Sequence, residues 1–273
     1  MSQNIRRKIQ PEQIVILLTI LTFVLIGWAC NTRIEGCLDP NASNFDFAAE
    51  QDCNGCCTYP VMTITLSQKW NNENFSTSDT LYDLNQNPYK IVDIRYFLSA
   101  WTWKGLDNTI YTVDSTEADC AGNKLKYTKD INAIEPRIFV YLLGKFRQAP
   151  VIDSVNFHMG LVEDFECLED TLSSTPDILT PASPLWNPDT DDLSTMRLIV
   201  NRNIVDSVFD TVFIDLHQLY SIGYPHPFQK GTDYSFLLTV NYAMWFEQVN
   251  IADLNSFGLS IAQGLDGSFT RTP

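Results

Sequence analysis

The sequence predicts a mainly β protein: an antiparallel β-sandwich preceded by a small cysteine-rich segment and an N-terminal signal or anchor. Aromatic residues make up 12% of the chain, and aromatic and β-branched residues favour strands. From Val61 onward, short apolar runs alternate with turn-forming residues. Hydrophobic residues make up 45% and charged residues 19%, which suits a packed core. We therefore expect a signal or anchor over 1–29, a cysteine-rich module over 30–60 and the sandwich over 61–273.

The N-terminus has the pattern of an export signal. Arg6, Arg7 and Lys8 precede an uncharged apolar run over 14–29. A membrane span needs about 20 apolar residues, so this shorter run better fits the apolar region of a signal peptide. The run ends at Cys30, and the residues just before it resemble a bacterial lipobox. We predict that Cys30 is acylated and holds the chain to a membrane as a periplasmic or outer-membrane lipoprotein. The alternative is an uncleaved signal-anchor, which also places the rest outside the cytoplasm.

Six cysteines follow Cys30, and an even number in an exported chain predicts disulfides. Four of them lie within 37–57 and are expected to pair among themselves, which leaves the last two to pair with each other. A zinc site of four thiolates usually needs a second Cys-x-x-Cys pair, which is absent, so disulfides are favoured. The predicted disulfide cysteines are Cys37, Cys53, Cys56, Cys57, Cys120 and Cys167.

The same cysteine-rich module concentrates oxygen-bearing side chains at short spacing, and Ca²⁺ takes 6–8 oxygen ligands. The competing interpretation is that these residues build turns through their own hydrogen bonds. Turns are favoured, because the glycine-bearing loop of an EF-hand is absent. The calcium candidates are Asp39, Asn41, Asn44, Asp46 and Asp52.

The expected strands begin with 61–67, where apolar and polar residues alternate strictly. A second strong strand covers 90–103 and ends at a turn. The remaining strand candidates are 137–146, 154–162, 195–201, 207–216 and 234–242. A short helix or bend is expected over 243–250, and acidic irregular loops over 115–134 and 163–194.

Charge and motif content narrow the possible functions. The formal net charge is −15, and removing residues 1–29 leaves −17, which repels the phosphates of nucleic acids. No Gly-x-Ser-x-Gly string or phosphate-binding glycine loop occurs. A catalytic cysteine is not expected where thiols oxidise. We therefore expect a binding protein and no enzyme; an extracytoplasmic hydrolase is the weakest hypothesis.

The chain has three histidines, His158, His217 and His226, and Met159 adjoins the first. Imidazole and thioether groups suit copper, so these four residues are the candidate metal ligands. Sequence spacing brings none of them together, and three unrelated histidines remain the alternative.

Tryptophans suggest a second binding function. Trp101 and Trp103 share one face of a predicted strand, and two rings on one face can stack on a sugar. Together with Trp186 they form the candidate platform of a glycan-binding or adhesion module. The alternative is that these rings fill the sandwich core.

Three segments resemble the MbnP-like family, exported β-sandwich lipoproteins of Bacteroidetes type: DIRYFLSAWTW (93–103), IDSVNFHMGLVEDFEC (152–167) and YSFLLTVNYAMWFEQVNI (234–251). The resemblance implies an exported, often lipid-anchored β-sandwich, and in some members copper binding. Many relatives carry a Gly-Met-Tyr-Trp-x-Trp string, of which only Trp186 remains here. The resemblance therefore implies fold and location, and it supplies no copper site.

Overall fold

The computed structural model describes residues 33–120, 123–128, 130–162, 179 and 181–272, with isolated positions 12, 15 and 19; between 115 and 129 it describes the backbone alone. Strands account for 46% of the chain and helices for 9%, which confirms the predicted β class. The chain forms two compact units. One comprises the described residues up to 57 except 41–43, and the other comprises 41–43 and everything from 58 onward. In the described part, no helix is both long and apolar enough to span a membrane.

The first unit is a small disulfide-bonded module. Strand β1 (Glu35–Gly36) pairs in parallel with β2 (Gln51–Asp52). Disulfides join Cys37 to Cys57 and Cys53 to Cys56. The expectation that these four cysteines pair among themselves is confirmed.

The other two predictions on cysteines remain predictions. Cys30 and Cys167 lie outside the described residues, and for Cys120 only the backbone is described. Acylation of Cys30 and the Cys120–Cys167 pair are therefore carried forward as expectations.

The larger of the two main sheets has the strand order β16-β15-β6-β12-β17, and every pair in it is antiparallel. The five strands are β16 (Val208–Ile214), β15 (Met196–Asn203), β6 (Pro88–Gly105), β12 (Val151–Met159) and β17 (Gln218–Pro227). Three short strands also pair with β6: β5 (Leu81–Tyr82), β7 (Ile110–Tyr111) and β10 (Asn132–Ile134).

The second sheet has the order β11-β3-β18-β19, with β4 beside β3. Its members are β11 (Val140–Lys145), β3 (Val61–Trp70), β18 (Tyr234–Asn241), β19 (Phe269–Arg271) and β4 (Glu73–Asn74). Along β3, Met62, Ile64 and Leu66 are buried while the intervening residues are partly exposed, which confirms the period of two. The β3–β18 pair is parallel, so the sandwich is not wholly antiparallel.

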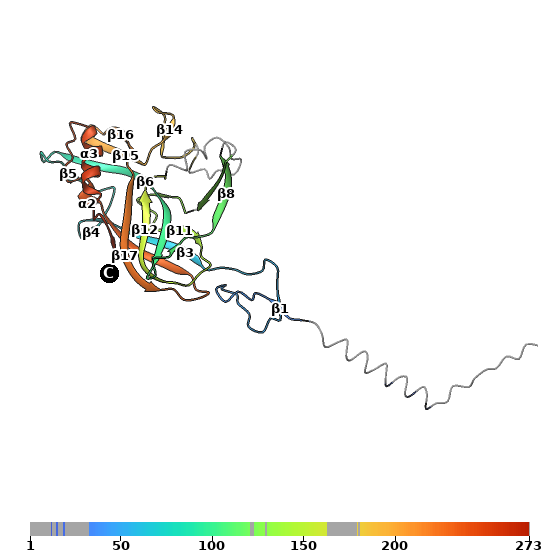
Figure 1. Ribbon diagram of the computed structural model, residues 1–273. Coiled ribbons are helices and arrows are strands. Elements are labelled where there is room, and N and C mark those ends of the chain that lie inside the picture. The colour runs from blue at the N-terminus through green and yellow to red at the C-terminus, as the bar shows by residue number, and fades with distance from the viewer. Residues whose placement is uncertain are drawn as a thin grey trace, which may run out of the picture. The chain divides into compact units, whose positions relative to one another are not determined.

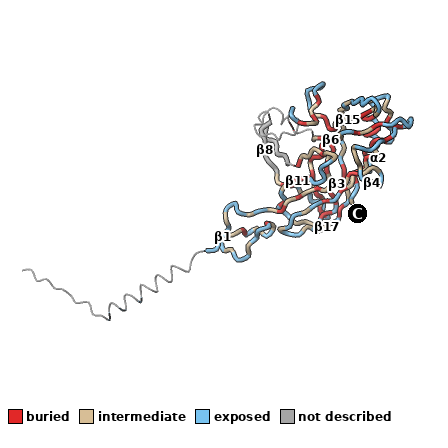
Figure 2. Tube along the Cα trace, turned by 180° about the vertical axis from the view of Figure 1, so that it is seen from behind, coloured by how far each residue is buried: buried red, intermediate tan, exposed pale blue. Residues whose placement is uncertain are grey.

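Aromatic side chains fill the space between the sheets. The ring of Trp103 on β6 lies 5.7 Å from that of Phe236 on β18, which links the two sheets. The ring of Trp101 stacks on that of Phe157 at 4.4 Å. Figure 2 shows the buried residues gathered inside the larger unit, with exposed residues around them. The hydrophobic effect thus acts through one continuous core.

Several elements were not predicted. Within 115–134, expected as a loop, β8 (Ser115–Cys120) pairs with β9 (Asn123–Thr128), and β10 pairs with β6. Residues 115–134 are mostly polar and show no alternation of apolar with polar residues. These strands, which are defined by backbone pairing, were therefore not predicted. In the other expected loop, residues 163–178 lie outside the description, whereas β13 (Trp186–Asn187) pairs with β14 (Asp192–Leu193).

The C-terminal region also contains more structure than expected. Strand β17 was missed because it contains Gly223, Pro225 and Pro227, residues typical of turns but tolerated on an edge strand. The expected bend is helix α2 (Tyr242–Trp245), and it is followed by the unpredicted helix α3 (Asn255–Gly264). Figure 1 shows α3 beside β16 at one end of the larger sheet.

Candidate functional site

Strand pairing brings two of the three histidines together. In the antiparallel β12–β17 pair, His158 lies opposite Leu219 and Met159 opposite Gln218. Continuing this register by one position places His217 opposite Gly160, as a diagonal neighbour of His158 on the same face. Diagonal neighbours lie about 7–8 Å apart, within reach of long side chains. The two imidazoles therefore form a pair at the end of β12.

Gly160 permits this arrangement because of its backbone conformation. Its φ of 101° is one that residues with a side chain rarely adopt. A Cβ added at Gly160 would lie 2.8 Å from the carbonyl oxygen of Leu216 and 3.0 Å from Nδ1 of His217. The Ser99 hydroxyl donates a 2.7 Å hydrogen bond to the carbonyl of Gly160, which holds this backbone in place.

The environment favours the neutral form of His158. Partial burial lowers its pKa below the usual value of 6.5, and the nearby charge of His217 lowers it further. A neutral imidazole has a lone pair free for a metal ion. His158 can therefore offer a nitrogen ligand at neutral pH without first losing a proton.

The other two predicted metal ligands do not join this pair. Met159 is fully buried in the core, because adjacent residues of a strand point to opposite faces. His226 lies opposite Ile152, six positions along β12 from His158, which is about 20 Å away. Its ring packs against Tyr234 instead, with ring centroids 4.7 Å apart. The four-ligand copper site is therefore wrong as a set, and among the described residues no three His, Cys, Asp or Glu side chains are grouped to hold a metal ion.

Three of the predicted calcium residues make hydrogen bonds within the cysteine-rich module. The carboxylate of Asp46 accepts a 2.8 Å hydrogen bond from the backbone N–H of Ala48. The Asn44 amide donates to the carbonyl of Cys56 at 2.9 Å, and Asp52 accepts from Leu38 at 3.5 Å.

The remaining two calcium candidates, Asp39 and Asn41, belong to different compact units. Of the three contacts, the one between Asp46 and Ala48 is of the kind that builds a turn, and the calcium set stays a prediction.

The tryptophans do not form a sugar platform. Trp101 and Trp103 are both 0% exposed, so neither ring face can meet a ligand in solvent. Trp186 is half-buried on the short strand β13. The sandwich-core interpretation is correct for the first two, because the side of β6 that carries them faces the second sheet.

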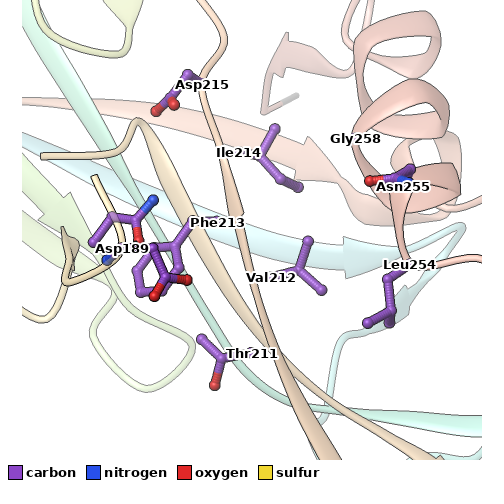
Figure 3. Close-up of a pocket in the computed structure, with 10 residues that line it drawn as sticks. Asp189, Thr211, Val212, Phe213, Ile214, Asp215, Leu254, Asn255 and Gly258 are labelled. Carbon is purple, nitrogen blue, oxygen red and sulfur yellow. Dashed lines mark hydrogen bonds between the residues drawn. The ribbon is translucent and has the colours of Figure 1, made fainter. Parts of the chain in front are cut away.

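A cavity of about 460 Å³ lies along β16, an edge strand of the larger sheet (Figure 3). One wall comes from the residues just before and at the start of α3, and the other from the turn between β13 and β14. In Figure 3, Val212 and Ile214 lie on the side of α3, whereas Phe213 and Asp215 lie on the side of Asp189. The cavity therefore extends over both faces of one edge strand.

Sequence analysis assigned 163–194, which includes Asp189, to an acidic irregular loop and found no groove. The groove depends on the packing of α3 against β16, where Gly258 lies close to Ile214. Since α3 itself was not predicted, no signal in the sequence pointed to this site.

Comparisons with known proteins give little further identification. No family model matches the chain, and no curated protein matches it. Among solved structures the chain is similar to "MbnP from Methylosinus trichosporium", with a TM-score of 0.42 and 9% sequence identity. The similarity covers 71% of this chain and 80% of that protein. It transfers no site residue and no ligand to this chain.

Proposed function

We propose that this chain is an exported, membrane-tethered, non-enzymatic binding protein whose β-sandwich presents His158 and His217 as ligands for a copper ion. The observation that carries the binding role is the pairing register of β12 and β17, which brings the two imidazoles onto one face.

Disulfides support the extracytoplasmic location. Two of them lie shortly after the apolar run that ends at Cys30. Such bonds persist in oxidising compartments and are rare in the cytosol. A lipid on Cys30 would hold the protein at the membrane surface and leave the sandwich free to meet its ligand.

Copper is the metal that fits the pair best. Imidazole nitrogens suit copper, zinc, iron and nickel, and copper stands highest in the affinity order for divalent ions. The cuprous ion also accepts two-coordinate geometry, so two imidazoles are a sufficient set for it. The lowered pKa of His158 reduces proton competition for its nitrogen at neutral pH.

A competition titration with cuprous ion tests the assignment. The chain from Cys30 onward is compared with His158→Ala, His217→Ala and the matched control His226→Ala, which removes an imidazole from the same strand pair. We expect either of the first two substitutions to weaken binding by at least about tenfold, since each removes one ligand. The control should bind like the unsubstituted chain. Equal binding by all four proteins, or no binding by any, would reject the site.

A further inference from the structure

The two edges of the larger sheet differ in how they are protected. Unpaired edge strands readily accept another strand, and proteins commonly block them with proline, bulges or lysine. Edge strand β17 carries Pro225 and Pro227 and shifts register against β12. Edge strand β16, with the sequence VFDTVFI, contains no proline or lysine and keeps a regular register from Phe209 to Ile214. Within the described part of the chain, no strand pairs with its outer side.

The outward-facing backbone groups of β16 can be identified from the ladder. The N–H of Phe97 on β6 donates a hydrogen bond to the carbonyl of Thr195. The carbonyl of Thr195, the residue just before β15, therefore points toward β6. The backbone N–H and C=O groups of successive residues point to alternate sides of a strand, so those of Met196 and Leu198 point toward β16. Their partners on β16 are Ile214 and Val212. The residues between them on β16, Thr211 and Phe213, therefore direct their N–H and C=O groups to the free edge.

The two walls of the groove differ in chemistry. On the side of α3, the surface is formed by the apolar Val212, Ile214, Leu254 and Gly258 together with the polar Asn255. The other side carries two carboxylates, Asp189 and Asp215, together with Asn187, Thr211 and the ring of Phe213. Successive side chains of a strand point to opposite faces. A strand added here would therefore present every second residue to a mainly apolar wall and the others to a wall that carries two carboxylates.

We propose that this groove binds an extended peptide segment of another protein that adds to the sheet beside β16 and alternates apolar with basic residues. Main-chain hydrogen bonds to Thr211 and Phe213 supply affinity, as in other cases of strand addition. The alternating walls select the side chains. The groove and the histidine pair use different side chains, although Asp215 in the groove wall lies two positions from His217 in the chain.

The test uses an acetylated and amidated heptapeptide of alternating lysine and valine, followed by fluorescence anisotropy. Thr211→Pro removes an outward N–H while leaving the ladder to β15 intact, and the control Thr211→Val keeps that N–H. We expect at least a tenfold loss of affinity for the proline variant and none for valine. A peptide of alternating glutamate and valine should bind at least tenfold more weakly to the unsubstituted protein.

Equal binding of the lysine–valine peptide to the proline and valine variants would indicate unspecific attraction to the acidic surface and would overturn the proposal. Absence of binding at millimolar peptide would also overturn it. Should Thr211→Pro fail to fold, Asp189→Lys provides the second test, because it reverses one wall charge and leaves β16 unchanged. Retained lysine-peptide affinity in that variant would contradict the acidic-wall assignment.

Discussion

Truncating Trp101 to alanine removes one of the largest fully buried side chains of the protein. A buried tryptophan removes about 200 Å² from water, worth about 5 kcal/mol at about 25 cal/mol per Å². Among the residues that the structure describes, the buried indole N–H of Trp101 has no hydrogen-bond partner, and removing it returns about 1–2 kcal/mol. The expected net loss in free energy of unfolding is therefore about 3–4 kcal/mol.

Trp101→Phe separates these contributions. Phenylalanine can keep the stack on Phe157 and lacks the unpaired N–H. The smaller ring leaves a small cavity, and the two effects nearly offset each other. We expect a stability within about 1 kcal/mol of the unsubstituted protein.

Urea unfolding followed by circular dichroism measures both variants, with the slope m checked for a common two-state transition. Trp186→Ala serves as the control, because that ring is only half-buried and should cost less. A loss below about 1 kcal/mol for Trp101→Ala would be typical of a surface residue and would refute the core placement. A loss for phenylalanine as large as that for alanine would refute the role of the unpaired N–H.

Three further predictions concern other residues. Because the folded-state pKa of His158 lies below 6.5, the folded protein binds a proton less readily than the unfolded chain, and its stability should fall as the pH drops below about 6.5. In urea titrations at several pH values, His217→Gln should reduce this loss of stability. An unchanged dependence of stability on pH would contradict the pairing of the two histidines. Asp83→Asn replaces a buried carboxylate that accepts four hydrogen bonds; urea unfolding should show a loss of about 2–3 kcal/mol, and less than about 0.5 kcal/mol would count against that network. Gly160→Ala forces a Cβ against the carbonyl of Leu216 and should lower the free energy of unfolding by about 2–4 kcal/mol. Unaltered thermal unfolding would contradict the backbone conformation assigned to Gly160.

Sequence patterns were sufficient where one face of a strand is buried and the other is not. Strand β3 is the clearest example, since the alternation of Met62, Ile64 and Leu66 with polar residues reports its burial directly. The same reasoning placed Trp101 and Trp103 on one face but left open whether that face meets solvent or a second sheet. Only the packing of β6 against β18 decides this, and the sequence does not contain it locally.

The histidine pair could not be predicted from the sequence for a related reason. Relating His158 to His217 requires knowing that β12 pairs with β17 and in which register. Because Pro225 and Pro227 concealed β17, that pairing was not available, and Met159 was included although it points into the core. The groove beside β16 likewise depends on α3, a helix with no side-chain hydrogen bond at its N-cap and no acidic residue in its first turn.

The most direct test of export and tethering is the intact mass of the protein extracted from membranes without reductant, after alkylation of free thiols. We predict a chain that begins at Cys30, carries acyl groups on that residue, and has Cys37, Cys53, Cys56 and Cys57 protected from alkylation. A chain that begins at Met1, with all seven cysteines alkylated, would contradict the proposed location and the disulfides together.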